Sequence, residues 1–157
     1  MPASPSRLRH TSRLASVLLA GVAACVGGSL TSTTNQASPA AAPDAFSCVR
    51  DQLKAIDFRQ TAYDAERLWV TAVRVDESQR RPDTQFRRMV DRLEIEVAPS
   101  TGEAISTITV QASTFAELTT QRGPTEIQEK ASERARSAAQ TILQKCSQPV
   151  DSLSVPG

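Results

Sequence analysis

The strictest constraint on the fold of this chain is the alternation of apolar and charged residues within residues 88–98, RMVDRLEIEVA. Leu93, Ile95 and Val97 occupy alternate positions, and the residues between them are charged. Because successive side chains of a β-strand point to opposite faces, this period of two predicts a strand with one buried face and one wet face. A strand of this kind is typical of an antiparallel sheet.

Three further segments have strand patterns. Residues 104–114 follow a short turn and alternate in the same way. Residues 67–75 carry apolar side chains on both faces, which is typical of a strand inside a sheet rather than at its edge. Residues 58–63 are a weaker candidate for the first strand.

Trp69, the only tryptophan, lies within residues 67–75. A large ring at this position either anchors the core or forms an exposed binding spot. Because the strand is rich in apolar residues, we predict the core position.

Helical spacing of apolar residues predicts two helices. The first spans residues 45–56 and follows Asp44, a residue type that caps helix N-termini well. The second and longest spans residues 125–146, and Thr125 with Gln128 has the spacing of a capping box. The alanines of this second helix would allow it to lie close to a sheet.

The order of these segments predicts one α+β domain over residues 44–147. We expect a four-stranded antiparallel meander with two helices on one face, in the order αββββα. For a chain in which aromatic residues make up only 4%, the core must be aliphatic and small.

The N-terminus has a different composition from the rest of the chain. Its only charged residues before an apolar block at residues 14–24 are Arg7, Arg9 and Arg13. A basic start followed by a short apolar block is the layout of a secretory signal. The block has 11 residues, fewer than the roughly 18–20 that a membrane-spanning helix needs. We therefore predict a signal peptide over residues 1–24.

The last residues of this signal, Val22-Ala23-Ala24-Cys25, resemble the lipobox of bacterial lipoproteins. The resemblance covers only the export signal. It implies that Cys25 becomes the first mature residue and carries lipid on its sulfur and its amino group. Several acyl chains anchor a protein stably, because each buried methylene contributes about 0.8 kcal/mol. The alternative is cleavage near residue 24 that leaves a soluble protein with a free thiol.

The cysteine count is consistent with this resemblance. The chain has three cysteines, and an odd number in an exported protein leaves one reactive thiol. If Cys25 is acylated, Cys48 and Cys146 remain, and an oxidising compartment favours a disulfide between them. Two antiparallel helices packed side by side would bring this pair together. Two separate buried thiols are the alternative.

Two segments that flank the predicted domain lack any periodic pattern. Residues 26–43 are small, polar and uncharged, and bury too little apolar surface to offset the entropy of ordering. We predict that residues 25–43 form a lipidated N-terminus with a flexible tether. Residues 148–157 are predicted to be a disordered tail.

Catalytic and cofactor-binding groups are scarce in the sequence. His10 is the only histidine and lies in the predicted signal, so the mature chain lacks the imidazole of a catalytic triad or a zinc site. Fifteen of the 18 basic residues but all 17 acidic residues follow Cys25, which argues against a nucleic-acid partner. We predict a protein that is not an enzyme and has no cofactor and no metal.

Four arginines are concentrated in the segment DESQRRPDTQFRR, residues 76–88; they are Arg80, Arg81, Arg87 and Arg88. Guanidinium groups form paired hydrogen bonds with phosphate or carboxylate, so this loop could contact lipid headgroups, lipopolysaccharide phosphates or an acidic partner. The alternative, which we favour, is a solvated loop balanced by nearby acids. These acids are Asp76, Glu77, Asp83 and Asp91.

Together these features favour a lipid-anchored, non-catalytic protein of the cell envelope that acts as an interaction or assembly-accessory module, with another envelope protein as its possible partner. Because Val26 is not the aspartate that retains such lipoproteins at the inner membrane, we expect the outer membrane, facing the periplasm, if the cell has one. The alternative function is a carrier or sensor of a small apolar ligand or lipid in a cleft between helices and sheet. The overall layout resembles small envelope lipoproteins, but the folded part indicates no named family.

Overall fold

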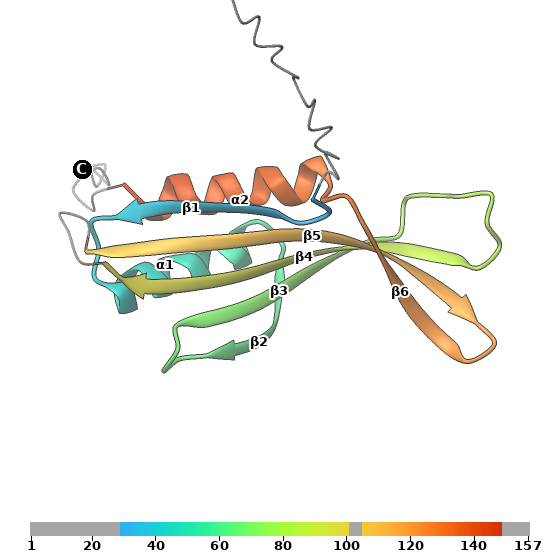
Figure 1. Ribbon diagram of the computed structural model, residues 1–157, viewed down its shortest axis with the longest axis horizontal. Coiled ribbons are helices and arrows are strands. Elements are labelled where there is room, and N and C mark those ends of the chain that lie inside the picture. The colour runs from blue at the N-terminus through green and yellow to red at the C-terminus, as the bar shows by residue number, and fades with distance from the viewer. Residues whose placement is uncertain (1–28, 101–104, 149–157) are drawn as a thin grey trace, which may run out of the picture.

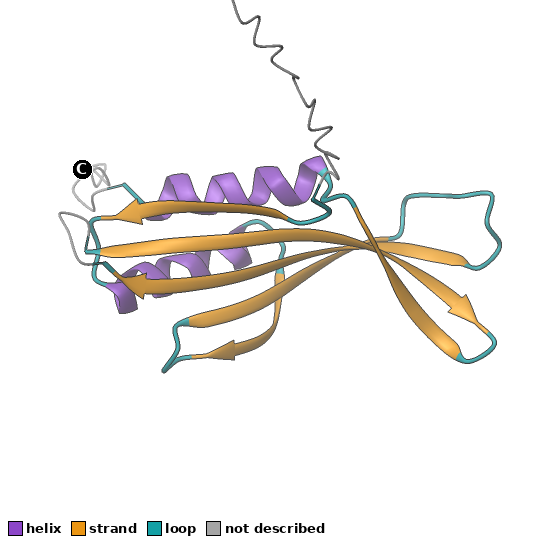
Figure 2. Ribbon diagram, in the orientation of Figure 1, coloured by secondary structure: helices purple, strands orange, loops and turns teal. Residues whose placement is uncertain are grey.

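The computed structural model describes residues 29–100 and 105–148. Its fold is α+β, as predicted, and strands predominate (Figure 2). The elements follow one another as β1 (Ser32–Ser38), α1 (Ala42–Ala55), β2 (Arg59–Asp64), β3 (Trp69–Asp76), β4 (Phe86–Pro99), β5 (Ser106–Thr120), β6 (Gly123–Glu129) and α2 (Glu133–Cys146) (Figure 1).

The strands form one six-stranded antiparallel sheet in the order β1-β5-β4-β3-β2, with β6 also paired to β5. β5 is long enough to have two neighbours on the same edge. Residues 106–112 pair with β1, and residues 114–120 pair with β6. The prediction of a four-stranded meander in the order αββββα is therefore wrong, because β1 precedes α1 and β6 precedes α2.

The hydrophobic core lies between the two helices and one face of the sheet. Leu93 and Ile95, which the alternating pattern places in the inner row, are completely buried. They belong to one cluster with Leu53 of α1 and Ile142 of α2. Both helices therefore cover the same face, and within the described residues no helix covers the opposite face of the sheet.

The structure corrects the prediction of a flexible tether over residues 25–43. β1 lies within this range, and α1 begins at Ala42. The side chains of β1 are polar and mostly exposed, so they give no apolar pattern. Main-chain pairing with β5 holds the strand instead. The folded unit thus begins before the predicted boundary at residue 44.

The predicted helix over residues 125–146 is also wrong in its first part, which forms β6. A two-residue turn joins β5 to β6, and Gly123 follows it with φ of +109°, a backbone conformation that favours glycine. Pairing with β5 overrides the local helical spacing. α2 begins after Ser132, whose hydroxyl accepts a hydrogen bond from the Ala135 N–H at 3.0 Å. Ser132, not Thr125, is the helix cap.

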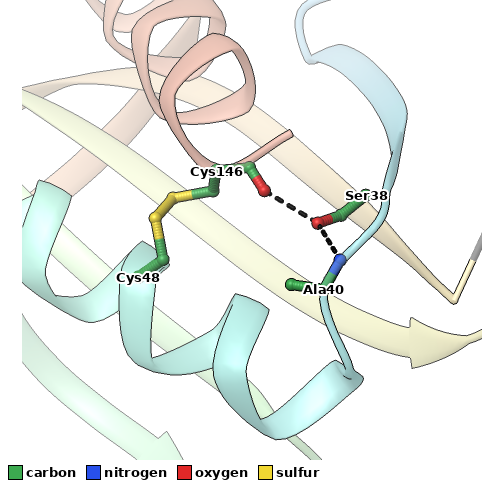
Figure 3. The surroundings of a disulfide bond; sticks show 4 residues. All are labelled: Ser38, Ala40, Cys48 and Cys146. Atoms are coloured by element: carbon green, nitrogen blue, oxygen red, sulfur yellow. Dashed lines mark hydrogen bonds between the residues drawn. A yellow bond between two sulfur atoms is a disulfide. The ribbon is translucent and has the colours of Figure 1, made fainter. Parts of the chain in front are cut away.

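A disulfide joins the two helices, as predicted (Figure 3). Cys48 in α1 and Cys146 at the end of α2 have their Cα atoms 5.8 Å apart. The completely buried Ser38 of β1 donates a hydrogen bond to the Cys146 carbonyl oxygen at 2.8 Å and accepts one from the Ala40 N–H at 3.3 Å. This end of the molecule therefore ties β1, α1 and α2 together.

The other end of the sheet extends beyond the helices (Figure 1). We call residues 77–90 and 114–129 the distal arm; they comprise the β3–β4 loop, the start of β4, the second half of β5, and β6. Met89, Val90 and Ala116 are buried there, but they lie outside the cluster under the helices. The arm therefore depends on other contacts for its shape.

Candidate interaction site

Several sequence-based predictions concern residues that the structure does not describe. The signal over residues 1–24, the lipidation site Cys25 and residues 149–157 of the predicted tail lie outside the described residues. They stay predictions.

The four arginines of the predicted contact site lie in the distal arm. Arg81 reaches from the β3–β4 loop to β6, where Nη1 and Nη2 bind the two carboxylate oxygens of Glu129, the second at 2.8 Å. The Arg81 guanidinium also lies over the ring of Phe86, 4.8 Å from its centroid. This arginine therefore fastens the loop to the edge strand.

A second carboxylate in the arm, that of Glu117, forms ion pairs with two of the arginines. Arg88 Nε lies 2.9 Å from Glu117 Oε2, and Arg87 Nη1 lies 3.1 Å from Glu117 Oε1. Glu117 is only 7% exposed, and a buried carboxylate of this kind costs free energy unless it is paired. The two arginines therefore offset the burial of Glu117.

Arg80 forms hydrogen bonds with the backbone carbonyls of Glu77 and Gln79 and, among the described residues, no salt bridge. All four arginines line one open cavity of about 370 Å³. The structure thus brings the predicted residues together, but their main partners are Glu117 and Glu129. Of the acids expected to balance them, Glu77 alone forms a salt bridge with one of the four in the described ranges.

Two of the acids near the arm have shifted pKa values. The hydrogen bond from Arg81 lowers the pKa of Glu129 below its ordinary value of 4.5. The side-chain and backbone hydrogen bonds from Ser78 lower the pKa of Asp76 to about 2, with a smaller contribution from Arg134. Both carboxylates are therefore ionised at neutral pH.

Asp91 has a structural role at the start of α2. Its side chain is 5% exposed and accepts hydrogen bonds from the Thr114 hydroxyl at 2.7 Å and the Ser132 hydroxyl at 2.8 Å. A carboxylate near a helix N-terminus also interacts favourably with the helix dipole. Asp91 therefore positions the helix cap rather than neutralising the arginine loop.

Trp69 is not in the core, contrary to the prediction. It is partly buried on the sheet face that has no helix, and it lies outside the core cluster. Asp64 of β2 and Glu96 of β4 lie directly opposite it in the strand register, one on each side. Directly opposite residues in antiparallel strands have Cβ atoms about 4.5–5.5 Å apart. The indole is therefore flanked by two carboxylates.

This row borders a cavity of about 460 Å³ at the end of the β2–β3 hairpin. Its lining includes the only tyrosine and the only tryptophan of the chain. Tyr63 is 56% exposed, and the Arg50 guanidinium lies 4.5 Å from the centroid of its ring. We call this the aromatic cavity; its lining residues are Tyr63, Asp64, Arg67, Trp69 and Glu96.

The hairpin turn fixes the backbone beside this cavity. Asp64 Oδ1 accepts hydrogen bonds from two N–H groups of the turn, at 3.0 and 3.1 Å, in the manner of an Asx turn. Leu68 has φ of +52°, which is costly for a residue with a side chain. The Val97 N–H donates to the Leu68 carbonyl oxygen at 3.0 Å and holds this conformation. The residue before Trp69 is therefore firmly placed.

The fold defines an α+β protein with a six-stranded antiparallel sheet and two disulfide-linked helices that both cover one face of it. No protein-family model matches the chain, and no curated protein matches it. In residues 29–100 and 105–148, no helix has the length and apolar character needed to cross a membrane. In the same ranges, no three His, Cys, Asp or Glu side chains lie close enough together to hold a metal ion.

The sequence contains a signal for the aromatic cavity that the prediction did not use. Val70 and Ala72 lie one and three positions after Trp69. Because successive side chains of a strand point to opposite faces, Trp69 lies on the face opposite to theirs. Antiparallel pairing with residues 88–98 matches that face with the row of Glu94 and Glu96, which is the wet face. The strand's apolar composition concealed this relation.

Proposed function

We propose that this protein is a lipid-anchored, non-catalytic module of the cell envelope that binds a partner protein at the aromatic cavity. The observation that carries the proposal is the gathering of Tyr63, Arg67 and Trp69 at the exposed end of an edge hairpin. Tyrosine, tryptophan and arginine are the residues that most often dominate the binding energy of protein interfaces.

The rigidity of the hairpin supports this proposal. The Asx turn and the Val97–Leu68 hydrogen bond hold the backbone next to Trp69. A site that is held in place before binding loses less conformational entropy on association. The aromatic cavity is thus suited to contact with a partner.

The place where the chain enters the fold supports an arrangement relative to the membrane. The Leu30 carbonyl oxygen accepts a hydrogen bond from the Ala131 N–H at 2.9 Å, beside the start of α2. Leu30 is the fifth residue after Cys25, so the two residues are at most about 18 Å apart. With an acylated Cys25, the sheet edge formed by β1 and β6 lies next to the bilayer. β2, whose residues Tyr63 and Asp64 line the aromatic cavity, forms the opposite edge of the sheet (Figure 1) and would then lie farther from the bilayer.

Contact of Arg80, Arg81, Arg87 and Arg88 with an anionic partner stays a prediction. The ion pairs with Glu117 and Glu129 compete with such a contact, so we assign these arginines first to the stability of the distal arm.

The predicted alternative, a carrier of an apolar ligand between helices and sheet, also stays a prediction. The side chains at that boundary, such as Leu53, Leu93 and Ile142, are completely buried against one another. A ligand there would have to displace core contacts, so the aromatic cavity is the better-supported binding site.

Site-specific photo-crosslinking in intact membranes tests the partner contact. A benzoylphenylalanine at position 63 is expected to form a discrete adduct with an envelope protein. The same group at the exposed Gln144 of α2, which does not line the cavity, serves as the control. An adduct pattern that is identical at the two positions would refute the assignment of the binding site.

The anchor is tested separately by cell fractionation. Cys25→Ser removes the acylated sulfur, so we expect the protein to move from the membrane fraction to the soluble fraction. Mass spectrometry of the native N-terminus provides an independent readout. Membrane association unchanged by the substitution would show that the lipid anchor was wrongly assigned.

A further inference from the structure

We infer that the aromatic cavity binds a positively charged side chain, lysine or arginine, of the partner protein. This inference rests on the proposed function, because it names the chemistry of the partner at the same site. It follows from the strand register, the local charge and the neighbouring guanidinium groups.

The strand register places an aromatic face between two negative charges. Asp64, Trp69 and Glu96 are directly opposite one another on three adjacent strands. The face of an indole attracts cations, more strongly than the faces of other aromatic side chains. A cation over Trp69 can therefore interact with the ring and with a carboxylate on either side.

Acids outnumber bases among the residues that line the cavity. Asp64 and Glu96 are the two acidic residues of the lining, and Arg67 is its one basic residue. Glu66 of the turn and Glu94 of β4 lie close to them in the chain. In the described part of the chain, neither Glu94 nor Glu96 forms a salt bridge. Both are exposed, so their charges are available to a partner. This local charge is complementary to a basic side chain and repels an acidic one.

Guanidinium groups of the protein itself already make contacts with an aromatic ring and with a carboxylate of this cavity. Arg50 of α1 lies over the ring of Tyr63, 4.5 Å from its centroid. Arg67 Nε lies 3.7 Å from Asp64 Oδ2, but its side chain is 84% exposed and only loosely held. Because Arg67 pairs only weakly with Asp64, a basic side chain of a partner can also interact with the Asp64 carboxylate.

A fluorescence titration tests the inference directly, because Trp69 is the only tryptophan. The whole chain, purified in detergent, is titrated with the peptide acetyl-(Gly-Arg)4-amide. Matched titrations use acetyl-(Gly-Glu)4-amide and the neutral sugar cellotetraose. We expect a saturable change in Trp69 emission with the arginine peptide, weakened by added salt, and none with the other two. Binding of the sugar alone, of both peptides equally, or of no probe would overturn the cationic assignment.

Charge-neutral variants locate the binding. Glu96→Gln and Asp64→Asn keep the size of the side chains, and asparagine can still accept the hydrogen bonds of the turn. Each substitution is expected to raise the dissociation constant of the arginine peptide about two- to fivefold, as for an exposed charge contact. Glu133→Gln, at the start of α2 behind the sheet, is the control and should leave the dissociation constant unchanged. Equal effects of all three variants would refute a contact at this site.

The aromatic contribution is measured by calorimetry, because the substitutions remove the fluorophore. Trp69→Leu is expected to raise the dissociation constant of the arginine peptide about two- to fivefold, and Trp69→Phe is expected to raise it less. Circular dichroism verifies that both variants fold. If crosslinking at position 63 succeeds while these titrations fail, the protein remains an interaction module but its partner contact is not cationic.

Discussion

At the scale of the residue, a few buried polar side chains decide where elements begin. Asp91 accepts hydrogen bonds from Thr114 and Ser132, and Ser132 in turn caps α2. These residues lie on β4, on β5 and before α2, so their contact exists only in the folded chain. The local capping-box spacing at Thr125 has no such support.

This difference predicts unequal effects of two conservative substitutions. Ser132→Ala removes the helix cap and a hydrogen bond to Asp91, and should lower the free energy of unfolding by about 1–2 kcal/mol. Thr125→Ala, on the exposed strand β6, should change it by less than about 0.5 kcal/mol. Urea unfolding of both variants measures the difference. The reverse order would favour the predicted helix over β6.

Trp69 illustrates how a single residue can be assigned to the wrong face. Its strand has apolar residues on both sides, and composition alone does not distinguish a core ring from a surface ring. Register with Glu96 and Asp64 places the ring on the sheet face without helices. By contrast, Leu93 and Ile95 were predicted correctly, because strict alternation with charged residues leaves only one face to bury.

At the scale of the element, the distal arm shows how charged contacts stabilise strands outside the main core. Arg81 joins the β3–β4 loop to β6, and Glu117 pairs with Arg87 and Arg88. Each partly exposed ion pair contributes little to the free energy of unfolding, and salt screens the interaction further. The arm should therefore be more sensitive to salt and acid than the helix-covered half of the sheet.

The Arg81–Glu129 contact gives this sensitivity a definite pH range. The pKa of Glu129 is lowered in the folded protein, so the stability from this contact is fully present above about pH 4.5. It is lost as the pH falls through the lowered pKa. Glu129→Gln should destabilise the protein by up to about 1 kcal/mol at pH 6 and by much less at pH 2.5. Unfolding measured at the two pH values tests this; an equal effect at both would contradict it.

The strands β1 and β6 are the two elements that the sequence did not predict. Both pair with the same edge of β5 and have mostly exposed side chains. An edge strand of this kind is held by main-chain hydrogen bonds, which leave little trace in side-chain composition. Pattern analysis therefore interpreted one as a tether and the other as the start of a helix.

At the scale of the whole molecule, the disulfide links the first helix of the fold, α1, to the last, α2. Cys48 and Cys146 are 98 residues apart in the chain. Cross-linking residues this far apart restricts the unfolded chain strongly, because the loop-closure entropy grows with loop length. Ser38 adds β1 to the same junction through the Cys146 carbonyl.

Cys146→Ala should therefore lower the free energy of unfolding by about 2–5 kcal/mol under oxidising conditions. Adding a reductant should lower the free energy of unfolding of the parent protein to a value close to that of the variant. Cys25→Ser, outside the disulfide, is the matched control and should leave the unfolding midpoint unchanged. A parent protein with the same midpoint before and after verified reduction would show that the bridge contributes no stability.

Local sequence patterns were enough to predict the α+β class, the buried rows of the central strands and the apolar face of α1. These features depend on local periodicity, because a strand or helix must bury a defined face wherever it packs. Tertiary structure decided the pairing of β1 and β6, the true start of α2, the partners of the four arginines and the placement of Trp69. Each of these depends on main-chain hydrogen bonds or charges contributed by segments distant in the chain, which no local pattern records.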